Sequence, residues 1–284
     1  MKRFLEKYFK IYSHESNRFL WMSSIFFALF LVTAVFRNFV DTAFLKRYGP
    51  DSIPLMLVIN AGLTFVIFAI ADRLGRKFKD HNLLSGFLVL YAAASGVLYV
   101  MVTADISIAY PILYQPLHLL DAILLVYLWN IAGDLFDARR GKKIFPLITA
   151  AQVLGTTIGS FGTKPFTLYF GENPALLLFA AVCLMVALFV STTAKGLVSR
   201  SLPKGSAAAS AGRKVRLAEV PGVMAHYPII RYLIITGLIP NILLPIFLYQ
   251  FNVIANHSFA SEQSLISFLS IFRGMTTLTT FVLL

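Results

Sequence analysis

Long apolar runs recur along the whole chain, separated by short polar connections. A helix needs roughly 20 mainly apolar residues to span a bilayer, and eight runs meet this requirement. They are Phe19–Val40, Ile53–Ala71, Leu83–Thr103, Ile106–Ile131, Phe145–Thr167, Ala175–Thr193, Ile229–Val253 and Ser264–Leu284. The runs lack the short alternation of apolar and polar residues that is typical of outer-membrane barrel strands. The pattern predicts an all-α polytopic membrane helical bundle, because a spanning helix satisfies its own backbone hydrogen bonds.

Two longer polar segments divide this pattern into parts. Residues 1–18 combine aromatic and basic side chains at helical spacing, which predicts an amphipathic helix on the inner leaflet. Residues 195–228 contain the sequence Gly-Ser-Ala-Ala-Ala-Ser-Ala-Gly within a basic stretch, which is typical of a flexible linker. We therefore expect an amphipathic N-terminal segment (1–18), a six-span half (19–194), a basic cytoplasmic linker (195–228) and two spans of a second half (229–284). The last run ends at Leu284 without a polar flank, so we expect the intact protein to continue through further spans.

The positive charge is distributed unevenly between the two sides of the predicted bundle. Only 13% of residues are charged, yet the net charge is +12. Twenty of the 25 Lys and Arg residues fall in the N-terminus and in the second, fourth and sixth connections, whereas three fall in the opposite connections. Since cytoplasmic loops carry the excess of Lys and Arg, we expect a cytoplasmic N-terminus in a multi-pass protein of the bacterial inner (plasma) membrane. Topology accounts for the basic composition, so we expect membrane lipid as a partner and no nucleic acid.

The connection between the second and third spans reads Asp-Arg-Leu-Gly-Arg-Lys from Asp72 to Lys77. This segment is similar to the D-R-x-G-R-K signature of the major facilitator superfamily. Asp72 is suited to pair with a neighbouring helix end and Gly75 to a tight turn. Asp72, Arg73, Gly75 and Arg76 are therefore candidate gating residues of a latch between helices. An ordinary inner loop would contain the same basic residues.

A second block runs from Trp129 to Ile148 and joins an acidic turn, a basic pair and the sequence Phe-Pro-Leu-Ile. Together with Ala43–Pro50 and the Tyr-Gln-Phe triplet at Tyr249, its order and membrane placement resemble the ATP:ADP antiporter family, the nucleotide transporters of plastids and intracellular bacteria. The resemblance implies a major-facilitator-like fold of two six-span halves and exchange of nucleotides. Further gating candidates in this block are Asp134, Arg139 and Arg140.

Small residues follow this block in the fifth span. Gly155 and Gly159 place two bare backbone positions on one helix face, and Gly162 follows them. The spacing predicts that another helix approaches closely. Such a face would serve either for packing alone or for sliding during transport.

Polar residues inside the spans are the best candidates for a site. An ionisable residue at the bilayer centre costs roughly 2.5–3.5 kcal/mol on insertion scales, so it usually faces protein or water. The fourth span carries polar residues at every third position, and the eighth carries an arginine about 14 Å deep. The candidate substrate-binding residues are Arg37, Asp41, Gln115, His118, Asp121 and Arg273.

Each candidate also has a purely structural interpretation. Arg37 would snorkel to the membrane surface or pair with Asp41, the strip in the fourth span would hydrogen-bond to other helices, and Arg273 would serve packing. No acidic residue lies within one helical turn of Arg273. We therefore expect this cation to face water, a partner or an anionic ligand.

The sequence favours a transporter over an enzyme. The histidines are scattered, Cys183 stands alone in an apolar run, and there is no phosphate-binding glycine loop, so we expect no enzymatic activity, metal site or cofactor. We expect a secondary active transporter that works by alternating access on a small anionic solute such as a nucleotide, by ATP/ADP-type exchange. The alternative is a membrane-embedded sensor or scaffold with a transporter-like fold and no transport, for which a fused or associated cytoplasmic regulatory domain is expected.

Overall fold

The computed structural model describes residues 13–198 and 228–284, and within these ranges it contains helices and no strand. The long helices are α2 (Ser13–Tyr48), α3 (Ile53–Gly75), α4 (Asp80–Thr103), α5 (Ala109–Leu135), α6 (Ala138–Phe170), α7 (Pro174–Val198), α9 (Pro228–Ser258) and α10 (Glu262–Leu283). Each predicted span lies largely within one of these helices, and all eight are long and apolar enough to cross a membrane. The prediction of an all-α, multi-pass membrane protein is confirmed at this level. The predicted amphipathic segment and most of the predicted linker lie outside the described residues.

Two glycines end helices that extend beyond their apolar runs. Gly49 follows α2 with φ +72°, and Gly171 follows α6 with φ +84°. Their backbone N–H groups donate to the carbonyl oxygens of Leu45 and Thr167, both at 3.0 Å. Glycine is favoured at these positions because other residues adopt the left-handed conformation at a cost. After Gly49, the 3₁₀ helix η1 (Pro50–Ser52) leads directly into α3.

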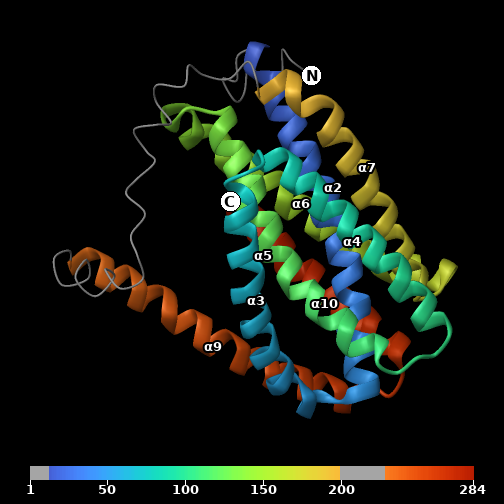
Figure 1. The fold of residues 1–284 in the computed structure, drawn as a ribbon. Helices are drawn as coiled ribbons and strands as arrows, with labels where there is room; N and C mark the ends of the chain where they lie inside the picture. Colours follow the sequence, from blue (N-terminus) through green and yellow to red (C-terminus); the bar gives the residue numbers. More distant parts are fainter. Residues whose placement is uncertain (1–12, 199–227) are drawn as a thin grey trace. The chain divides into compact units, whose positions relative to one another are not determined.

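The chain forms two compact units, of which the larger contains α2 to α7 together with α10. Within this unit α2 is the most buried helix and contacts α5, α6, α7 and α10 (Figure 1). Its closest partner is α6, where a Cβ atom on Gly155 or Gly159 would collide with the backbone carbonyl of Phe27 or Leu31. Gly162 has open space around it. The predicted close approach is thus confirmed at Gly155 and Gly159.

Hydrogen bonds and aromatic contacts fix the remaining helices of this unit. Between α4 and α7, the Ser95 hydroxyl donates to the carbonyl oxygen of Leu176 at 2.9 Å. Trp21 on α2 donates its indole N–H to the Thr193 hydroxyl on α7 at 2.7 Å. α10 packs on α6, where the ring of Phe161 lies against Gly274. Together with α5, the helices α6, α7 and α10 surround α2, which carries polar side chains in its second half.

The smaller unit spans Leu202–Ser258, and its described part is α9. This helix continues through Pro240 and Pro245, which interrupt the regular backbone hydrogen bonding because proline has no N–H. Large apolar side chains remain exposed along α9, as they do along α3 in the larger unit. Exposed apolar side chains are the expected surface of a helix that contacts lipid.

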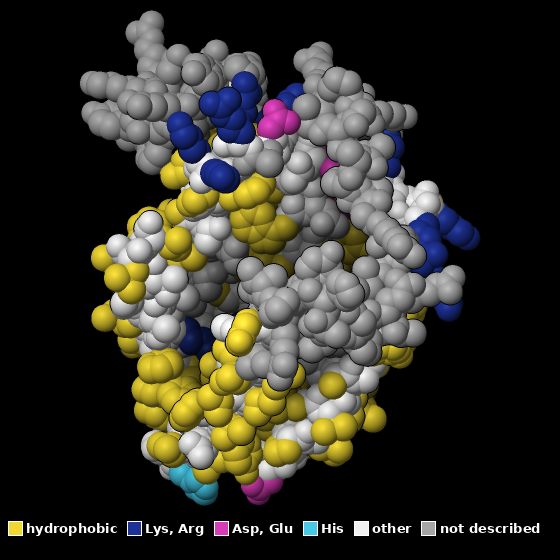
Figure 2. All heavy atoms as spheres, turned by 90° about the vertical axis from the view of Figure 1, so that its left-hand side faces the viewer, with side chains coloured by type: hydrophobic (Ala, Val, Ile, Leu, Met, Phe, Trp, Pro, Cys, Tyr) yellow, Lys and Arg dark blue, Asp and Glu magenta, His cyan; other side chains and the backbone are white. Residues whose placement is uncertain are grey.

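The surface shows the charge pattern of a membrane protein. Apolar side chains cover much of the described surface in Figure 2, and Lys and Arg side chains gather near its top, at the end where α2 begins in Figure 1. The basic connections after α3 and α5 belong to this end, because successive spans alternate in direction. The assignment of this end to the cytoplasm stays a prediction.

Candidate functional site

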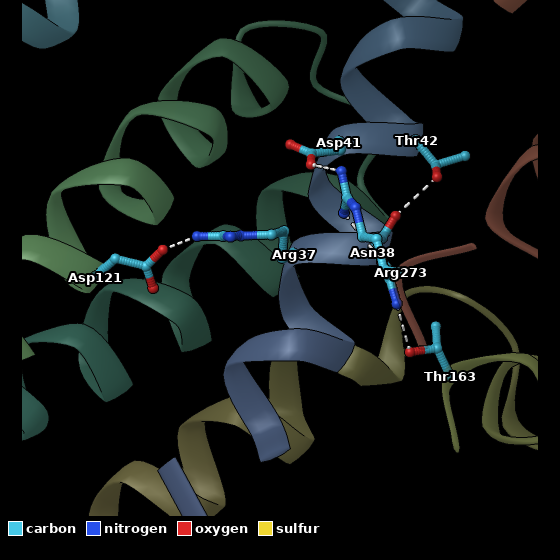
Figure 3. Close-up of polar contacts among 7 residues, drawn as sticks. All are labelled: Arg37, Asn38, Asp41, Thr42, Asp121, Thr163 and Arg273. Atoms are coloured by element: carbon cyan, nitrogen blue, oxygen red, sulfur yellow. Dashed lines mark hydrogen bonds and ion pairs between the residues drawn. The ribbon is translucent and has the colours of Figure 1, made fainter. Parts of the chain in front are cut away.

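Six polar residues from four helices meet deep inside the larger unit. We call them the arginine network (Figure 3). They are Arg37, Asn38 and Asp41 of α2, Asp121 of α5, Thr163 of α6 and Arg273 of α10. Four of them are charged, two of each sign, so the formal charge of the network is zero.

Arg273 is held by two residues of α2. Its Nη2 forms an ion pair with Asp41 Oδ2 at 2.6 Å, and its Nη1 donates to Asn38 Oδ1 at 3.0 Å. Asn38 is fully buried, and its Nδ2 donates to the Thr163 hydroxyl at 3.0 Å. The cation predicted to need a partner therefore finds one on another helix, and the same asparagine connects it to α6.

Arg37 pairs with a different carboxylate. Its guanidinium forms an ion pair with Asp121 of α5 and points toward it, away from Arg273 (Figure 3). The side chains of Arg37 and Asp121 are 36% and 26% exposed, whereas that of Asp41 is only 12% exposed. Of the two interpretations of Arg37, pairing is the one found, but with Asp121 in place of Asp41. The Arg37–Asp121 pair is the more accessible part of the network.

The two arginines of the network lie at similar depth along their helices. Arg37 is eleven residues from the end of α2 at Tyr48, and Arg273 is eleven residues from the start of α10 at Glu262. At about 1.5 Å per residue, both lie roughly 16 Å from the same end of the unit. Half of a hydrocarbon core about 30 Å thick is about 15 Å. The two arginines thus lie close to the middle of the predicted membrane.

Three buried polar atoms in this region have no hydrogen-bond partner within the described part of the chain. They are Nε of Arg37, Oδ1 of Asp41 and Oε1 of Gln115. Buried polar groups normally have a partner, and an exception needs an explanation. One donor and two acceptors are therefore unused around the network.

The polar strip of α5 makes contacts between helices. Gln115 donates its side-chain N–H to the backbone carbonyl of Met56 on α3 at 3.0 Å, and Asp121 pairs with α2. Both contacts agree with the interpretation of the strip as hydrogen bonding between helices. The side chain of His118 lies outside the described residues, so its role stays a prediction.

The gating candidates of α3 lie at the end of that helix. Asp72 forms an ion pair with Arg76, four residues further on, and Arg73 is exposed. Gly75 is the last residue of α3, and its φ is not in the left-handed region. The turn therefore makes no conformational demand for glycine there. The latch from Asp72 to a neighbouring helix stays a prediction.

The gating candidates of α5 and α6 include one contact between helices. Arg140, in the first turn of α6, pairs with the buried Glu15 near the start of α2. Asp134 and Arg139 are exposed near the junction of α5 and α6. No local pattern in the sequence links Arg140 to Glu15, because 125 residues separate them.

A second cluster, which the sequence did not indicate, lies where α2 ends. We call Arg47, Tyr110, Glu172 and Glu262 the Arg47 cluster. Arg47 Nη1 pairs with Glu262 Oε2 at 2.8 Å, and the guanidinium carbon lies 4.1 Å from the centre of the Tyr110 ring. Burial, with a further contribution from the neighbouring Glu262 carboxyl, raises the pKa of Glu172 to about 7, while Arg47 acts in the opposite direction.

Comparison with known proteins identifies no relative: no family model, no curated protein and no solved structure matches the chain. The fold and the site geometry define it as a multi-pass helical membrane protein with a charged network inside its bundle.

Proposed function

We propose that this protein is a secondary active transporter of small anionic solutes, working by alternating access. The observation that carries the proposal is the pair of arginines at mid-membrane depth, each bound to a carboxylate on another helix. Charged residues within spans are rare and usually mark a solute or ion pathway. The resemblance to ATP:ADP antiporters supports nucleotides as the solute class and exchange as the mode.

The contacts of Arg273 suggest how an anion would act on the helices. Asp41 and a phosphate or carboxylate group of a solute compete for the same guanidinium, because both accept from its N–H groups. An anion that takes the place of Asp41 would remove the ion pair between α2 and α10. Binding would thereby loosen one helix contact and let the two helices move relative to each other, as alternating access requires.

The Arg37–Asp121 pair offers a second exchangeable contact. It is more exposed than the Arg273–Asp41 pair, and Nε of Arg37 has no hydrogen-bond partner among the described residues. A solute with several anionic oxygens, as in a nucleotide, would engage Arg37 first and Arg273 afterwards. This order agrees with the neutral resting network, in which no arginine carries an uncompensated charge.

Binding of ATP and ADP to the purified protein in nanodiscs tests this proposal. Arg273→Gln should weaken binding by about 10- to 100-fold, which corresponds to the loss of a charge-assisted hydrogen bond of about 1.5–3 kcal/mol. Arg273→Lys should recover part of the affinity, since Lys keeps the charge but not the planar fork. Lys142→Gln is the matched control, because it removes an exposed cation near the start of α6, far along that helix from Thr163 of the network.

Asp41→Asn provides a test with the opposite sign. The substitution removes the carboxylate that competes with the solute for Arg273, so nucleotide affinity should rise. If neither Asp41→Asn nor Arg273→Gln changes affinity in folded protein, the network has a structural role only.

The neutral network also favours a second candidate function. Because each arginine is already compensated, the network would serve equally as a structural lock in a membrane sensor or scaffold that transports nothing. Flux separates the two functions, since a sensor would bind a nucleotide without moving it across liposomes.

A further inference from the structure

Asp41 is a buried carboxylate with one ion-pair partner among the described residues. Its side chain is 12% exposed, and its Oδ2 pairs with Nη2 of Arg273 at 2.6 Å. Its Oδ1 is buried and has no hydrogen-bond partner within the described part of the chain. The amide of Asn38 directs its Nδ2 to the Thr163 hydroxyl instead. The negative charge of Asp41 is therefore stabilised chiefly by Arg273.

Asp41 has charged or titratable neighbours on three helices. They are Arg37 of α2, Tyr114 of α5 and Arg273 of α10. Arg37 is already engaged by Asp121 and points toward it (Figure 3). Two other long helices pack on α2. Of these, α6 contributes the uncharged hydroxyl of Thr163 to the network, and the described titratable side chain of α7 is the buried Cys183.

Binding of an anion would remove the partner of Asp41. In the proposed function, the solute takes the place of Asp41 on Arg273. A buried carboxylate without its ion-pair partner is strongly unfavourable, and such a group is normally neutralised by a proton. Asp121 differs, because its side chain is 26% exposed and can be hydrated when a solute displaces it from Arg37. Asp41 lacks this compensation, since its Oδ1 is closed off from solvent.

We propose that Asp41 binds a proton when an anion occupies Arg273, so that the protein carries a proton together with its anionic solute. The inference rests on the proposed function, because it requires the anion to displace Asp41. The proton comes from water and converts the carboxylate into a neutral carboxyl group. While the solute is bound, this group donates its O–H to an oxygen of the anion, which replaces a repulsion by a hydrogen bond. The proton returns to water when the solute leaves and the ion pair with Arg273 forms again.

Proton uptake on nucleotide binding tests the proposal. ADP is titrated into the purified protein in nanodiscs at about pH 7.5, where its phosphate groups are almost fully ionised, in two buffers that differ in ionisation enthalpy. The dependence of the binding heat on the buffer gives the number of protons taken up. It should be about one per ADP in the wild-type protein and about zero in Asp41→Asn. Wild-type affinity should fall by up to about tenfold per pH unit above this pH, while that of Asp41→Asn should change little.

A control and a second measurement locate the proton. Asp51→Asn removes an exposed carboxylate of η1, outside the network, and should keep the proton uptake. Infrared difference spectra with and without ADP should show a new protonated carboxyl band in the wild-type protein and none in Asp41→Asn. The wild-type band tests the site even where the variant does not fold.

The outcomes distinguish this inference from the proposed function. ADP binding without proton uptake or without the carboxyl band would overturn the proton site and leave the transporter proposal standing. Proton uptake that persists in Asp41→Asn would also overturn the proton site. No binding of ADP to the wild-type protein would overturn both proposals.

Discussion

Gly159 offers a direct test of the packing that positions the arginine network. A Cβ atom at this position would lie 2.9 Å from the carbonyl carbon and 3.0 Å from the Cα of Leu31, and would overlap the carbonyl oxygen. These are backbone atoms, so no side-chain rotation relieves the contact. Gly159→Ala therefore forces α6 away from α2.

The expected cost follows from this overlap. Ordinary contacts of a Cβ atom begin at 3.4 Å, and the carbonyl oxygen of Leu31 is the nearest atom, so the helices must separate by roughly 1 Å or more. Overpacking of this kind costs about 1–3 kcal/mol. Gly162→Ala adds the same methyl group to the same helix at a position where nothing lies within 4 Å. Both substitutions also gain the same helix propensity, because each replaces glycine with alanine inside α6. The difference between the two variants therefore isolates the packing term of about 1–3 kcal/mol.

Cys183 supplies the assay. It is the only cysteine of the chain and is fully buried in α7, so a thiol-reactive fluorescent dye reacts with it only after unfolding. Thermal unfolding of the two variants in the same detergent should show Gly159→Ala well below Gly162→Ala in midpoint. Equal midpoints would refute the close packing of α2 on α6.

Three further predictions concern other parts of the chain. Because the pKa of Glu172 is raised in the folded state, stability should fall as the pH rises from 4.5 to about 7, and thermal midpoints of Glu172→Gln should not show this fall. Asp105 has φ +56° in the turn after α4, so Asp105→Gly should raise the unfolding free energy by about 0.5 kcal/mol in the dye assay. An impermeant maleimide applied to intact cells should label Asp51→Cys and not Lys142→Cys, and the reverse result would invert the predicted orientation.

The sequence predicted the helices because local composition determines them. Each apolar run became one helix, since a span must be about 20 residues long and must satisfy its own backbone. The ends were less predictable. α2 continues from Val40 to Tyr48, because a helix extends through polar residues until a residue such as Gly49 ends it.

The candidate residues of the network were predictable, but their partners were not. Arg273 was a candidate because a charge in an apolar run is costly. Its partner Asp41 is 232 residues away, and no spacing rule reaches that far. For Arg37, the local rule pointed to Asp41 four residues on, yet tertiary packing brought Asp121 to it instead.

The Arg47 cluster could not be predicted from the sequence at all. Arg47, Glu172 and Glu262 lie in or beside connections, where charged residues are ordinary. Only the fold brings Arg47 and Glu262 into contact, because 215 residues separate them in the sequence. The contacts of Asn38 with Arg273 and with Thr163 were not predicted either, because a buried amide between helices has no signature in the local sequence.

Exchange of labelled nucleotide across liposomes tests the central claim most directly. Liposomes containing the protein and unlabelled ADP are placed in labelled ATP, and uptake is followed over time. We predict accumulation that needs the internal nucleotide and that is lost in Arg273→Gln but kept in Lys142→Gln. Uptake no greater than in protein-free liposomes, or uptake unchanged by Arg273→Gln, would contradict the account.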